Sequence, residues 1–437
     1  MARWTSVILD SLTGAQETRV TPRPSVEIDP IAIIGLGRIG LALAGHYLER
    51  GFRVIGCDTD VVRREGIADG EIARGEPGLE TALRRGIEEL RFTATGDAGG
   101  AARAARTSLV IVPVTADSGG QIDAGPLEDV AKRVVGSAPA GSLVVVETTV
   151  PVGTTRRLFG AARSAVAYSP ERVSVGSVFR DLRAYPKIVG GRDEDSLALA
   201  SSFYARTLDG AVVMPVGSLE TAEFVKLIET TYRFVNIGLA NEFALAAERH
   251  GVDVTRAIEA ANSQPYSHIH SPGVGVGGHC IPVYPFFLEA GASATAIVRA
   301  SRAVNVGMPQ VIVDKVRSAL GTLSGRRVLL LGIAFRPGTK ESANSPAFTV
   351  HRLITDAGGI VAAYDPLYGE DETRAAGLIP ADLGARYDAV VLVTAHPEFL
   401  DLGIVARSAP VVVVDGRNAW PRGDIERLGI RYLGVGR

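Results

Sequence analysis

The stretch IAIIGLGRIGLALAGHYLERGFRVIGCDTD, residues 31–60, constrains the fold more strongly than any other part of the chain. It holds an apolar run, a glycine turn, a segment of helix length and a second apolar run that ends in acid. Together these predict a β-α-β unit. Gly35 allows a tight turn, Gly37 leaves room for a phosphate to approach the backbone, and Gly40 lets helix and strand pack closely. A glycine turn used only for packing is the alternative.

The same unit has the features of a dinucleotide site. Arg38 and Ile39 open the expected helix, whose free N–H groups favour an anion. Asp58 ends the second strand 18 residues after Gly40. An acid there can bind the adenosine ribose and repel a 2′-phosphate. We therefore expect NAD, rather than NADP, as the cofactor.

Further patterns extend this unit into an α/β protein with two doubly wound domains. The apolar runs SLVIVPV, SLVVVETT and AVAYSP are expected strands separated by helix-length segments, which predicts one Rossmann-like domain over residues 30–210. The strand pattern resumes in GRRVLLLGIAF, GIVAAYDP, YDAVVLVTAH and PVVVVDGRN, which predicts a second, smaller domain over residues 325–437. Residues 1–29 are expected to form a loosely ordered tail, with at most a short helix near residues 7–12.

A long helix is expected between the two domains. The segment from Ser218 to Gly251 has 34 residues and no proline, with a serine to cap its start and a glycine to end it. Helical segments continue to about residue 322. Residues 211–324 are therefore expected to form a central helical region, which often serves as a dimer interface.

Composition excludes several classes of function. Hydrophobic residues make up 46% and charged residues 22% of the chain, which fits a globular protein with a large core. The net charge of −2 gives no broad basic field for nucleic acid or an anionic membrane. No apolar run reaches the roughly 18 residues that a membrane span needs, and the N-terminus does not read as a signal peptide. Two cysteines are too few for a disulfide framework, so the cytoplasm is the simplest location.

Lysine is rare, which makes each lysine informative. Only five of the 46 basic residues are lysines: Lys132, Lys187, Lys226, Lys315 and Lys340. Where arginine is the default cation, a lysine suggests a task that needs a group able to lose its proton.

Helical spacing places Lys226 on a polar stripe of the long helix. Thr230, Arg233 and Asn241 share this stripe, because positions 226, 230, 233, 237 and 241 lie on one face of a helix. The opposite face is expected to pack into the core, and it contains Phe224, Leu227, Ile228 and Val235.

The segment SPGVGVGGHCIPVYP, residues 271–285, presents Cys280 in a loop almost free of side chains. We expect the backbone N–H groups of Gly277 and Gly278 to favour the thiolate, because positive potential lowers a thiol pKa. His279 is not expected to act as its base, since adjacent residues usually point apart. Cys57 lies inside an expected strand and is expected to be a buried, inert thiol.

Several motifs occur together and in a fixed order: GLGRIG, ETTVPVGTT with YSPERV, EFVKLIETTYRFVNIGLANE, SPGVGVGGHCIPVYP, LLGIAFRPGTKESANSP and VVVVDGRNAW. Over residues 30–420 the chain resembles the UDP-glucose/GDP-mannose dehydrogenase family, which includes UDP-N-acetylmannosamine dehydrogenases. The resemblance implies an enzyme that oxidises the C6 hydroxyl of a nucleotide-diphosphate hexose to a carboxylate with two NAD. It also implies an N-terminal NAD domain, a C-terminal sugar-nucleotide domain and a homodimer formed through the central helix.

The resemblance also implies roles for individual residues. Cys280 would form a thiohemiacetal and then a thioester, because an aldehyde has no hydride to give until a nucleophile adds to it. Lys226 would assist deprotonation of the C6 hydroxyl, Glu171 would activate the hydrolytic water, and Thr149 would lie beside the nicotinamide. Thr115 would also contact the cofactor. The residues expected at the substrate, besides Glu171 and Lys226, are Arg172, Thr230, Arg233, Gly277, Arg336 and Arg417. No metal is expected.

The chain departs from the family pattern at several positions. Thr230 replaces a usual Asn, and Tyr284 replaces a usual Asp four residues after the cysteine. Gln264 and Tyr266 stand where an Arg is expected, and Arg38 stands where an aromatic residue is common. These changes leave the nucleophile, the lysine and the glutamate in place but bear on the sugar and on hydrolysis.

The expected substrate is UDP- or dTDP-glucose, giving the uronic acid. UDP-N-acetylmannosamine and UDP-N-acetylglucosamine are alternatives, and TTYRFVNIGLANE and GVGGHC look closer to the N-acetylmannosamine branch. An enzyme that stops at the aldehyde and a sugar-nucleotide-binding protein without activity remain further alternatives. Cys280, Lys226 and Glu171 argue against the last of these.

Overall fold

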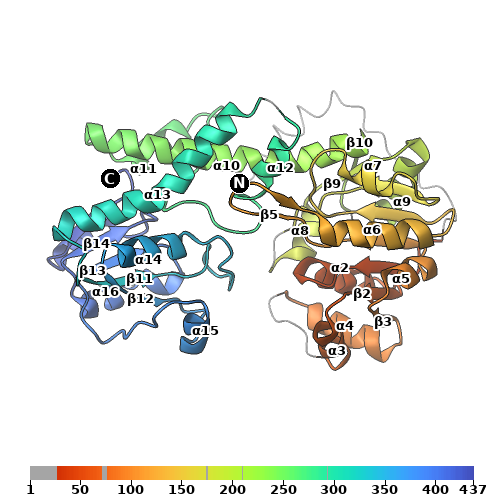
Figure 1. The fold of residues 1–437 in the computed structure, drawn as a ribbon, viewed down its shortest axis with the longest axis horizontal. Coiled ribbons are helices and arrows are strands. Elements are labelled where there is room, and N and C mark those ends of the chain that lie inside the picture. The colour runs from red at the N-terminus through yellow and green to blue at the C-terminus, as the bar shows by residue number, and fades with distance from the viewer. Residues whose placement is uncertain (1–26, 71–75, 174–175, 209, 293) are drawn as a thin grey trace. The chain divides into compact units, whose positions relative to one another are not determined.

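The structure is a computed structural model that describes residues 27–437 except 71–75, 174–175, 209 and 293. Nearly all of the expected tail, with its possible helix at residues 7–12, lies outside the described residues. The chain divides into two compact units (Figure 1). The first includes residues up to Thr115 and Gln121–Lys226, and the second combines Ala116–Gly120 with Leu227–Arg437. The three expected domain ranges remain predictions.

The first unit is built on an eight-stranded sheet with the order β10-β9-β8-β7-β4-β1-β2-β3. From β3 to β8 every neighbouring pair is parallel, in the order of a Rossmann fold, and β9 then pairs antiparallel with β8. The strands are β1 (Ile31–Ile34), β2 (Val54–Cys57), β3 (Phe92–Thr95), β4 (Thr107–Val110), β7 (Leu143–Val146), β8 (Ala165–Tyr168), β9 (Lys187–Gly191) and β10 (Val213–Ser218). A separate two-stranded sheet pairs β5 (Thr115–Ala116) with β6 (Ile122–Asp123).

Helices connect these strands, because parallel neighbours need a crossover. The helices are α2 (Arg38–Glu49), α3 (Val61–Ala68), α4 (Leu79–Glu88), α5 (Ala98–Ala104), α6 (Gly125–Ser137), α7 (Thr154–Phe159), α8 (Val178–Ala184) and α9 (Glu194–Thr207). Asp60 and Asp193 cap α3 and α9 by accepting backbone N–H groups of the first turn.

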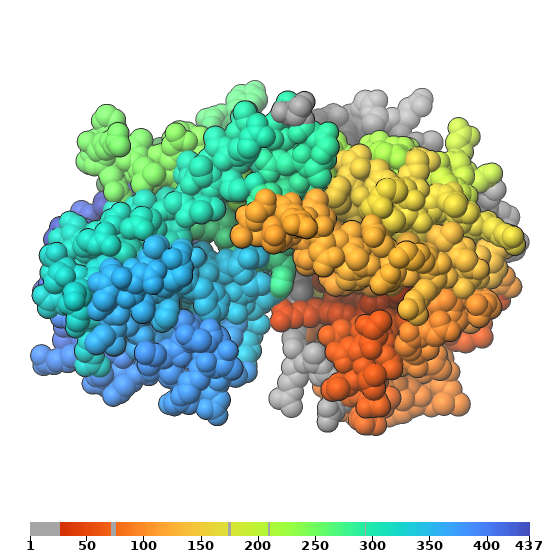
Figure 2. Space-filling view, viewed as in Figure 1, coloured from red at the N-terminus to blue at the C-terminus, as the bar shows by residue number. Residues whose placement is uncertain are grey.

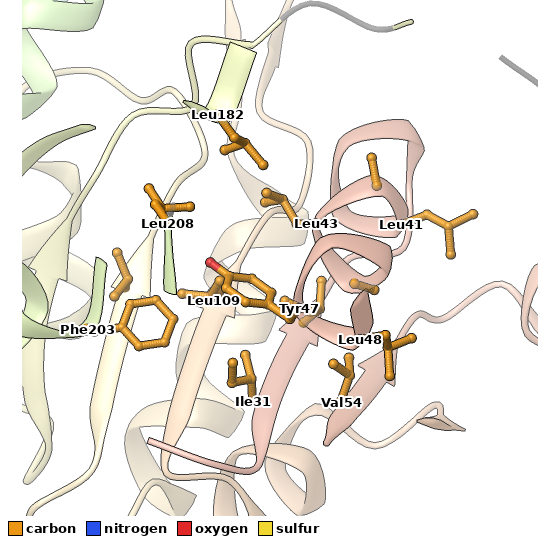
Figure 3. Close-up of a cluster of buried hydrophobic side chains, with 14 of the residues drawn as sticks. Ile31, Leu41, Leu43, Tyr47, Leu48, Val54, Leu109, Leu182, Phe203 and Leu208 are labelled. Atoms are coloured by element: carbon orange, nitrogen blue, oxygen red, sulfur yellow. The ribbon is translucent and has the colours of Figure 1, made fainter. Parts of the chain in front are cut away.

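The core of the first unit lies between α2 and the sheet. Figure 3 shows the ring of Tyr47 among aliphatic side chains from the strands and from the later part of the unit. Ile31 and Leu109 come from neighbouring strands, while Phe203 and Leu208 belong to or follow α9. Because these residues are almost completely buried, the glycine turn between β1 and α2 rests on a closely packed support.

A single helix, α10 (Leu219–His250), follows β10 directly and appears as one unbroken ribbon in Figure 1. At 1.5 Å per residue its 32 residues extend about 48 Å. Ser218 Oγ accepts the Thr221 N–H at 3.1 Å, and Gly251 ends the helix with φ +65°. The predicted start and end of the long helix are therefore confirmed.

The prediction of which face of α10 packs into the core is wrong. Phe224 and Ile228 are exposed, Val235 is partly buried, and Leu227 alone of the four is fully buried. The side of the helix that packs inward instead includes Thr230 and Asn241, which had been assigned to the polar stripe. Small and polar side chains occupy this face because hydrogen bonds, rather than aliphatic packing, join part of it to its neighbours.

The second unit contains a five-stranded, fully parallel sheet in the order β12-β11-β13-β14-β15. This is the other common doubly wound order. The strands are β11 (Arg327–Leu331), β12 (Ile360–Tyr364), β13 (Ala389–Leu392), β14 (Val412–Asp415) and β15 (Arg431–Gly434). The helices are α11 (Val254–Ala261), α12 (Tyr284–Glu289), α13 (Ala296–Leu320), α14 (Pro346–Asp356), α15 (Glu370–Ala375), α16 (Gly403–Ser408) and α17 (Arg422–Arg427), with a 3₁₀ turn at Pro397–Phe399.

One hydrophobic cluster joins α10, α13 and α14 to this sheet, through residues such as Ala244, Ile312, Val350 and Leu330. In the space-filling view α13 and α14 lie at the surface of the second unit (Figure 2). The α/β class with two doubly wound sheets and a long central helix is thus confirmed. Among the helices of the described residues, none is long and apolar enough to cross a membrane.

The glycine turn gives a test of the packing. A Cβ at Gly40 would lie 1.8 Å from the carbonyl oxygen of Gly35, whereas a Cβ at Gly37 would have nothing within 4 Å. We expect Gly40→Ala to lower the free energy of unfolding by about 1–3 kcal/mol or more, through overpacking. Gly37→Ala is the matched control and should change it by less than about 0.5 kcal/mol. Denaturant unfolding of both variants measures the difference, and equal stabilities would contradict the packing argument.

Candidate active site

The turn between β1 and α2 has the shape of an anion cradle. Gly35 has φ +105°, and a Cβ there would lie 2.1 Å from the Ile111 carbonyl oxygen. Gly37 is exposed and precedes Arg38 and Ile39, which open α2, and no side-chain cap bonds the first N–H groups of this helix. These residues fit a dinucleotide pyrophosphate, because the backbone at Gly37 is open to close approach and lies at the N-terminus of α2, which favours an anion.

Asp58 follows β2 and is fixed by three donors. Its carboxylate accepts the Leu36 N–H at 2.8 Å, the Asp60 N–H at 3.0 Å and Arg63 Nη1 at 2.9 Å. Partial burial opposes ionisation, but these hydrogen bonds outweigh it and lower the pKa of Asp58. The side chain is therefore an anion at neutral pH, as exclusion of a 2′-phosphate requires. Thr115, the other expected cofactor contact, lies exposed at the start of β5.

Glu171 follows β8 and is held by a buried lysine. Its Oε2 accepts Lys187 Nζ at 2.8 Å, and its Oε1 accepts the N–H groups of Arg172 and Val173. Lys187 also donates to Glu147 Oε1 at 3.1 Å. Burial by itself raises a carboxyl pKa, but the charge and hydrogen bond of Lys187 and the Arg172 N–H lower the pKa of Glu171.

Two residues on the first turns of α10 hold the loops that follow β7 and β8. Glu223 is fully buried and accepts the N–H groups of Gly153 and Thr155 at 2.6 and 2.8 Å, at the start of α7. Lys226 Nζ donates to the carbonyl oxygen of Glu171 at 2.6 Å. Because Thr149 lies between β7 and α7, the helix fixes both segments that bear expected catalytic groups.

Of the other expected substrate residues in the first unit, Arg172 donates Nη1 to the Pro186 carbonyl oxygen at 3.1 Å. Further along α10, in the second unit, Thr230 is buried and its hydroxyl lies 3.3 Å from the Leu227 carbonyl oxygen. Arg233 is exposed. The structure therefore gives Thr230 a local hydrogen bond and leaves Arg233 at the surface of its helix.

Cys280 is exposed at the end of the glycine loop in the second unit. Its sulfur lies 3.6 Å from Tyr284 Oη, because Tyr284 opens α12 one turn later and its N–H bonds the Cys280 carbonyl oxygen. His279 Nε2 instead pairs with Glu341 at 2.7 Å. Tyr284, which departs from the family pattern, is thus the side chain bonded to the thiol.

The expected role of the loop glycines needs correction. The Gly278 N–H donates to the Ala343 carbonyl oxygen at 2.7 Å and is therefore not available to a thiolate. A Cβ at Gly277 would lie 2.6 Å from the Phe335 side chain, and Gly278 has φ +98°. These glycines let the loop pack against the segment after β11, a requirement that the sequence motif did not reveal.

The start of the same loop is tied to the helices by a buried amide network. Asn241 Oδ1 accepts the Gly273 N–H at 2.8 Å, and Asn241 Nδ2 donates to Asn305 Oδ1 at 2.9 Å. Asn305 in turn donates to the Phe234 carbonyl oxygen. The expected polar position of Asn241 thus serves to anchor the cysteine loop.

In the turn after β11, as in the turn after β1, an aspartate from the end of the next strand accepts backbone N–H groups. Asp365 follows β12 and accepts the N–H groups of Ile333 and Ala334, and His396 contacts it at 3.1 Å. Arg336 lies just beyond this turn and is partly buried. Arg417 follows β14, where its Nε donates to the Val393 carbonyl oxygen and its Nη1 lies against Gly273. Both arginines therefore lie at the carboxyl edge of the second sheet, where ligands of doubly wound folds bind.

Three sequence models of one family match consecutive parts of the chain. The NAD binding domain matches residues 29–208, the central domain residues 220–306 and the UDP binding domain residues 329–422. The chain belongs to the UDP-glucose/GDP-mannose dehydrogenase family. It is an NAD-dependent nucleotide-sugar dehydrogenase, as the motifs predicted.

Relatives and solved structures agree with this membership. The UDP-N-acetyl-D-mannosamine dehydrogenase of Pyrococcus horikoshii is 33% identical over 430 residues, covering 93% of this chain and 99% of that protein. The solved structure of that enzyme matches with a TM-score of 0.82 at 32% identity, over 93% of this chain and 99% of the other. A UDP-glucose dehydrogenase from Pyrobaculum islandicum matches with a TM-score of 0.82 at 29% identity, over 95% and 99%.

The sequence did not point to Glu147, Lys187 or Glu223 as parts of the site. The rarity of lysine in this dehydrogenase was a usable signal for Lys187, which is one of only five. Glu147 and Glu223 were visible as acids next to the TTVP and Lys226 motifs, but their partners lie 40 and 70 residues away. No group of three or more His, Cys, Asp or Glu side chains that could hold a metal occurs among the described residues.

The geometry of Asp58 predicts cofactor selectivity. Asp58→Asn removes the charge that repels a 2′-phosphate and releases Arg63 from its ion pair, while an amide can still accept the Leu36 N–H. We expect the ratio of kcat/KM for NAD over NADP to fall by about tenfold or more, the scale of one charged hydrogen bond. Initial rates with both cofactors measure this ratio. Asp60→Asn, which alters an acid paired with Arg63 outside the turn, is the control, and an unchanged ratio in Asp58→Asn would refute the assigned role.

Proposed function

We propose that this dehydrogenase oxidises the C6 hydroxyl of a nucleotide-diphosphate hexose through both steps to the carboxylate. The exposed thiol of Cys280, bonded to Tyr284 at the end of the glycine loop, is the observation that carries the proposal. Cys57 cannot serve this purpose, because it is buried and burial raises its pKa to about 11. Release of the aldehyde after one step is the alternative, since Tyr284 replaces an expected acid.

The proposed reaction converts one alcohol, two NAD⁺ and one water into one carboxylate, two NADH and three protons. NAD, held at the turn between β1 and α2, supplies the hydride-accepting chemistry. Lys226 stabilises the alkoxide of the substrate, and loss of the first hydride from C6 gives the aldehyde. The Cys280 thiolate then adds to the aldehyde carbon, and its oxygen takes up a proton, to give a thiohemiacetal. Loss of hydride from that carbon leaves a thioester. Water then adds, the carbon–sulfur bond breaks, the thiolate leaves and Glu171 accepts the proton of the water.

Other residues are proposed to bind the reactants. Thr149 and Thr115 contact the cofactor together with Arg38 and Ile39. The basic side chains Arg336 and Arg417 suit the pyrophosphate or the sugar, since guanidinium groups form paired hydrogen bonds with phosphate oxygens. Gly277, Arg172, Thr230 and Arg233 complete the proposed substrate contacts.

For the substrate we propose a UDP-linked 2-acetamido hexose, with UDP-N-acetylmannosamine as the first candidate. Relatives named UDP-N-acetyl-D-mannosamine dehydrogenase match at 30–33% identity over most of the chain. UDP-glucose is the second candidate, supported by the Pyrobaculum islandicum neighbour. The expectation of dTDP-glucose has no such support.

Stoichiometry tests the four-electron reaction. One sugar nucleotide should consume two NAD without free aldehyde, in a panel of UDP-, dTDP- and GDP-linked hexoses followed by NADH absorbance and product mass. Cys280→Ser should lose the second oxidation while it still binds the sugar nucleotide. Cys57→Ser is the matched control and should keep both steps. One NAD per sugar in the unmodified enzyme would overturn the proposal, and the best substrate of the panel decides the hexose.

We also propose that the dehydrogenase forms a homodimer through α10. Within the second unit, Ile228, Tyr232, Leu239 and Phe243 lie at intervals of four and seven residues on one side of this helix, and each is 40% exposed or more. Such a continuous apolar stripe on a long helix is typical of a surface that another chain covers. A second copy is the proposed occupant, because the stripe on one copy can cover the same stripe on another.

A charge on this stripe should separate the chains. We expect Leu239→Asp with Phe243→Asp to reduce the mass measured by light scattering or sedimentation from two chains to one, because two buried carboxylates would lack partners. Glu242→Gln, an exposed position between them, is the control and should leave the mass unchanged. A single-chain mass for the unmodified protein, or a two-chain mass for the double variant, would contradict the proposed interface.

A further inference from the structure

Lys187 lies between two carboxylates in the interior of the first unit. Its Nζ is 2.8 Å from Glu171 Oε2 and 3.1 Å from Glu147 Oε1. The side chains of Lys187, Glu171 and Glu147 are only 6%, 10% and 0% exposed. One buried cation therefore serves two acids, and a second buried negative charge would lack a counter-charge.

The hydrogen bonds decide which of the two acids carries the charge. Glu171 receives three donors over both oxygens, namely Lys187 and the N–H groups of Arg172 and Val173. Glu147 receives Lys187 and the Tyr204 hydroxyl, both on Oε1, whereas its buried Oε2 has no hydrogen-bond partner among the described residues. An ionised carboxylate needs partners on both oxygens, so this arrangement favours an ionised Glu171 and a neutral Glu147.

The electrostatic environment agrees with this assignment. Burial raises the pKa of Glu147, and the lysine only partly offsets this effect. For Lys187 burial lowers the pKa, but the two carboxylates outweigh it and the pKa rises, so the lysine stays charged. Two neighbouring acids whose pKa values are driven apart have distinct roles, one as a base and one as a proton-bearing group.

The remaining groups around Glu171 come from other elements. Lys226 of α10 donates to its carbonyl oxygen, and Tyr47 and Tyr204 lie in the same buried region, where burial, and after it the charge of Glu147, raises the pKa of both phenols. A small cavity lined by Glu171, Arg172, Lys187, Asp181 and Tyr185 has about 10 Å³ of room for the centre of a water molecule. This volume is about what one ordered water requires. A water can therefore reach Glu171 and Lys187 from the side that faces α8.

We propose that Lys187 is a positioning residue that holds Glu171 ionised and oriented as the hydrolytic base, while Glu147 remains a neutral acid beside it. Lysine suits this place because a single compact charge reaches both acids, whereas a guanidinium needs more room. The role as a base rests on the function proposed above. The charge assignment within the three side chains rests only on the geometry of the first unit.

The kinetic test removes the charge of Lys187 in a Glu147→Gln background, so that Glu171 is then the one carboxylate left in this cluster. Glu147→Gln mimics the neutral acid, and we expect the acid limb of the pH profile for thioester hydrolysis to stay where it is in the unmodified enzyme. Adding Lys187→Met should move this limb upward by about one to three pH units, the effect of an opposite charge at this distance. Lys187→Arg in the same background, which keeps the charge but needs more room, should return the limb toward its original pH, even if the rate stays below that of Glu147→Gln. The decay of the Cys280 adduct, followed by rapid quench and intact mass, measures hydrolysis directly.

Two controls separate a charge effect from a structural one. Lys132→Met removes an exposed lysine of the same unit and should leave the limb in place. Glu171→Gln should accumulate the adduct at every pH. A loss of rate without movement of the limb in Glu147→Gln/Lys187→Met would assign Lys187 a structural role only and overturn the proposal, as would an upward shift in Glu147→Gln alone.

A second measurement does not depend on activity. With Lys187 present, the pKa of Glu171 is lowered in the folded state, so its contribution to stability is complete above the ordinary Glu pKa of about 4.3 and is lost below it. Without the lysine, burial raises the folded pKa, so that stability should instead increase as pH falls from 7 to 5. Between pH 7 and 5, the contribution of Glu171 to thermal stability should therefore stay constant in Glu147→Gln and increase in Glu147→Gln/Lys187→Met. Adding Glu171→Gln should abolish the difference.

The two measurements distinguish the two possible failures. If the unmodified enzyme oxidises no nucleotide sugar, the proposed function is wrong, and the unfolding curves still decide the charge assignment. If it oxidises the sugar but both variants respond to acid in the same way, the assignment to Lys187 is wrong while the proposed function stands.

Discussion

Parallel pairing of β1, β2, β4, β7 and β8 is the constraint on which the first unit depends. Because parallel strands all end at the same edge of a sheet, the residues that follow them collect there. Gly35, Asp58, Thr115, Thr149 and Glu171 all follow these strands along the chain. The glycine turn proposed to hold the cofactor and a set of polar groups therefore lie together because of this one topological rule.

Carboxylates fix the backbone at this edge. Asp58 and Asp365 follow the second strand of their sheets along the chain. In the turn after the first strand, Asp58 accepts one N–H group and Asp365 accepts two. Glu223 fixes the start of α7 in the same way from α10. In each case a buried or partly buried acid satisfies N–H groups that would otherwise lack partners, so the turns are held in one shape before any ligand binds.

Rigidity also explains the cysteine loop. Asn241 holds its beginning, and the Gly278 N–H bonds Ala343 near its end. The thiol that emerges from this loop is exposed, while the backbone that carries it is anchored at both ends. The glycines allow this close packing, and the Cys280 thiol donates its hydrogen bond to Tyr284 Oη, 3.6 Å away.

The sequence by itself determined the β-α-β units, the long helix with its two ends, the glycine turn and the family. These features are encoded by local periodicity, by turn residues at fixed offsets and by the order of motifs. The tertiary structure alone decided that Lys187 joins Glu147 to Glu171, that the Gly278 N–H is used by the backbone, and that Phe224 and Ile228 face outward on α10. The physical reason is that helical or strand spacing specifies which residues share a face. The partner of that face, and the charge on a buried acid, depend on segments tens of residues away that only folding brings into contact.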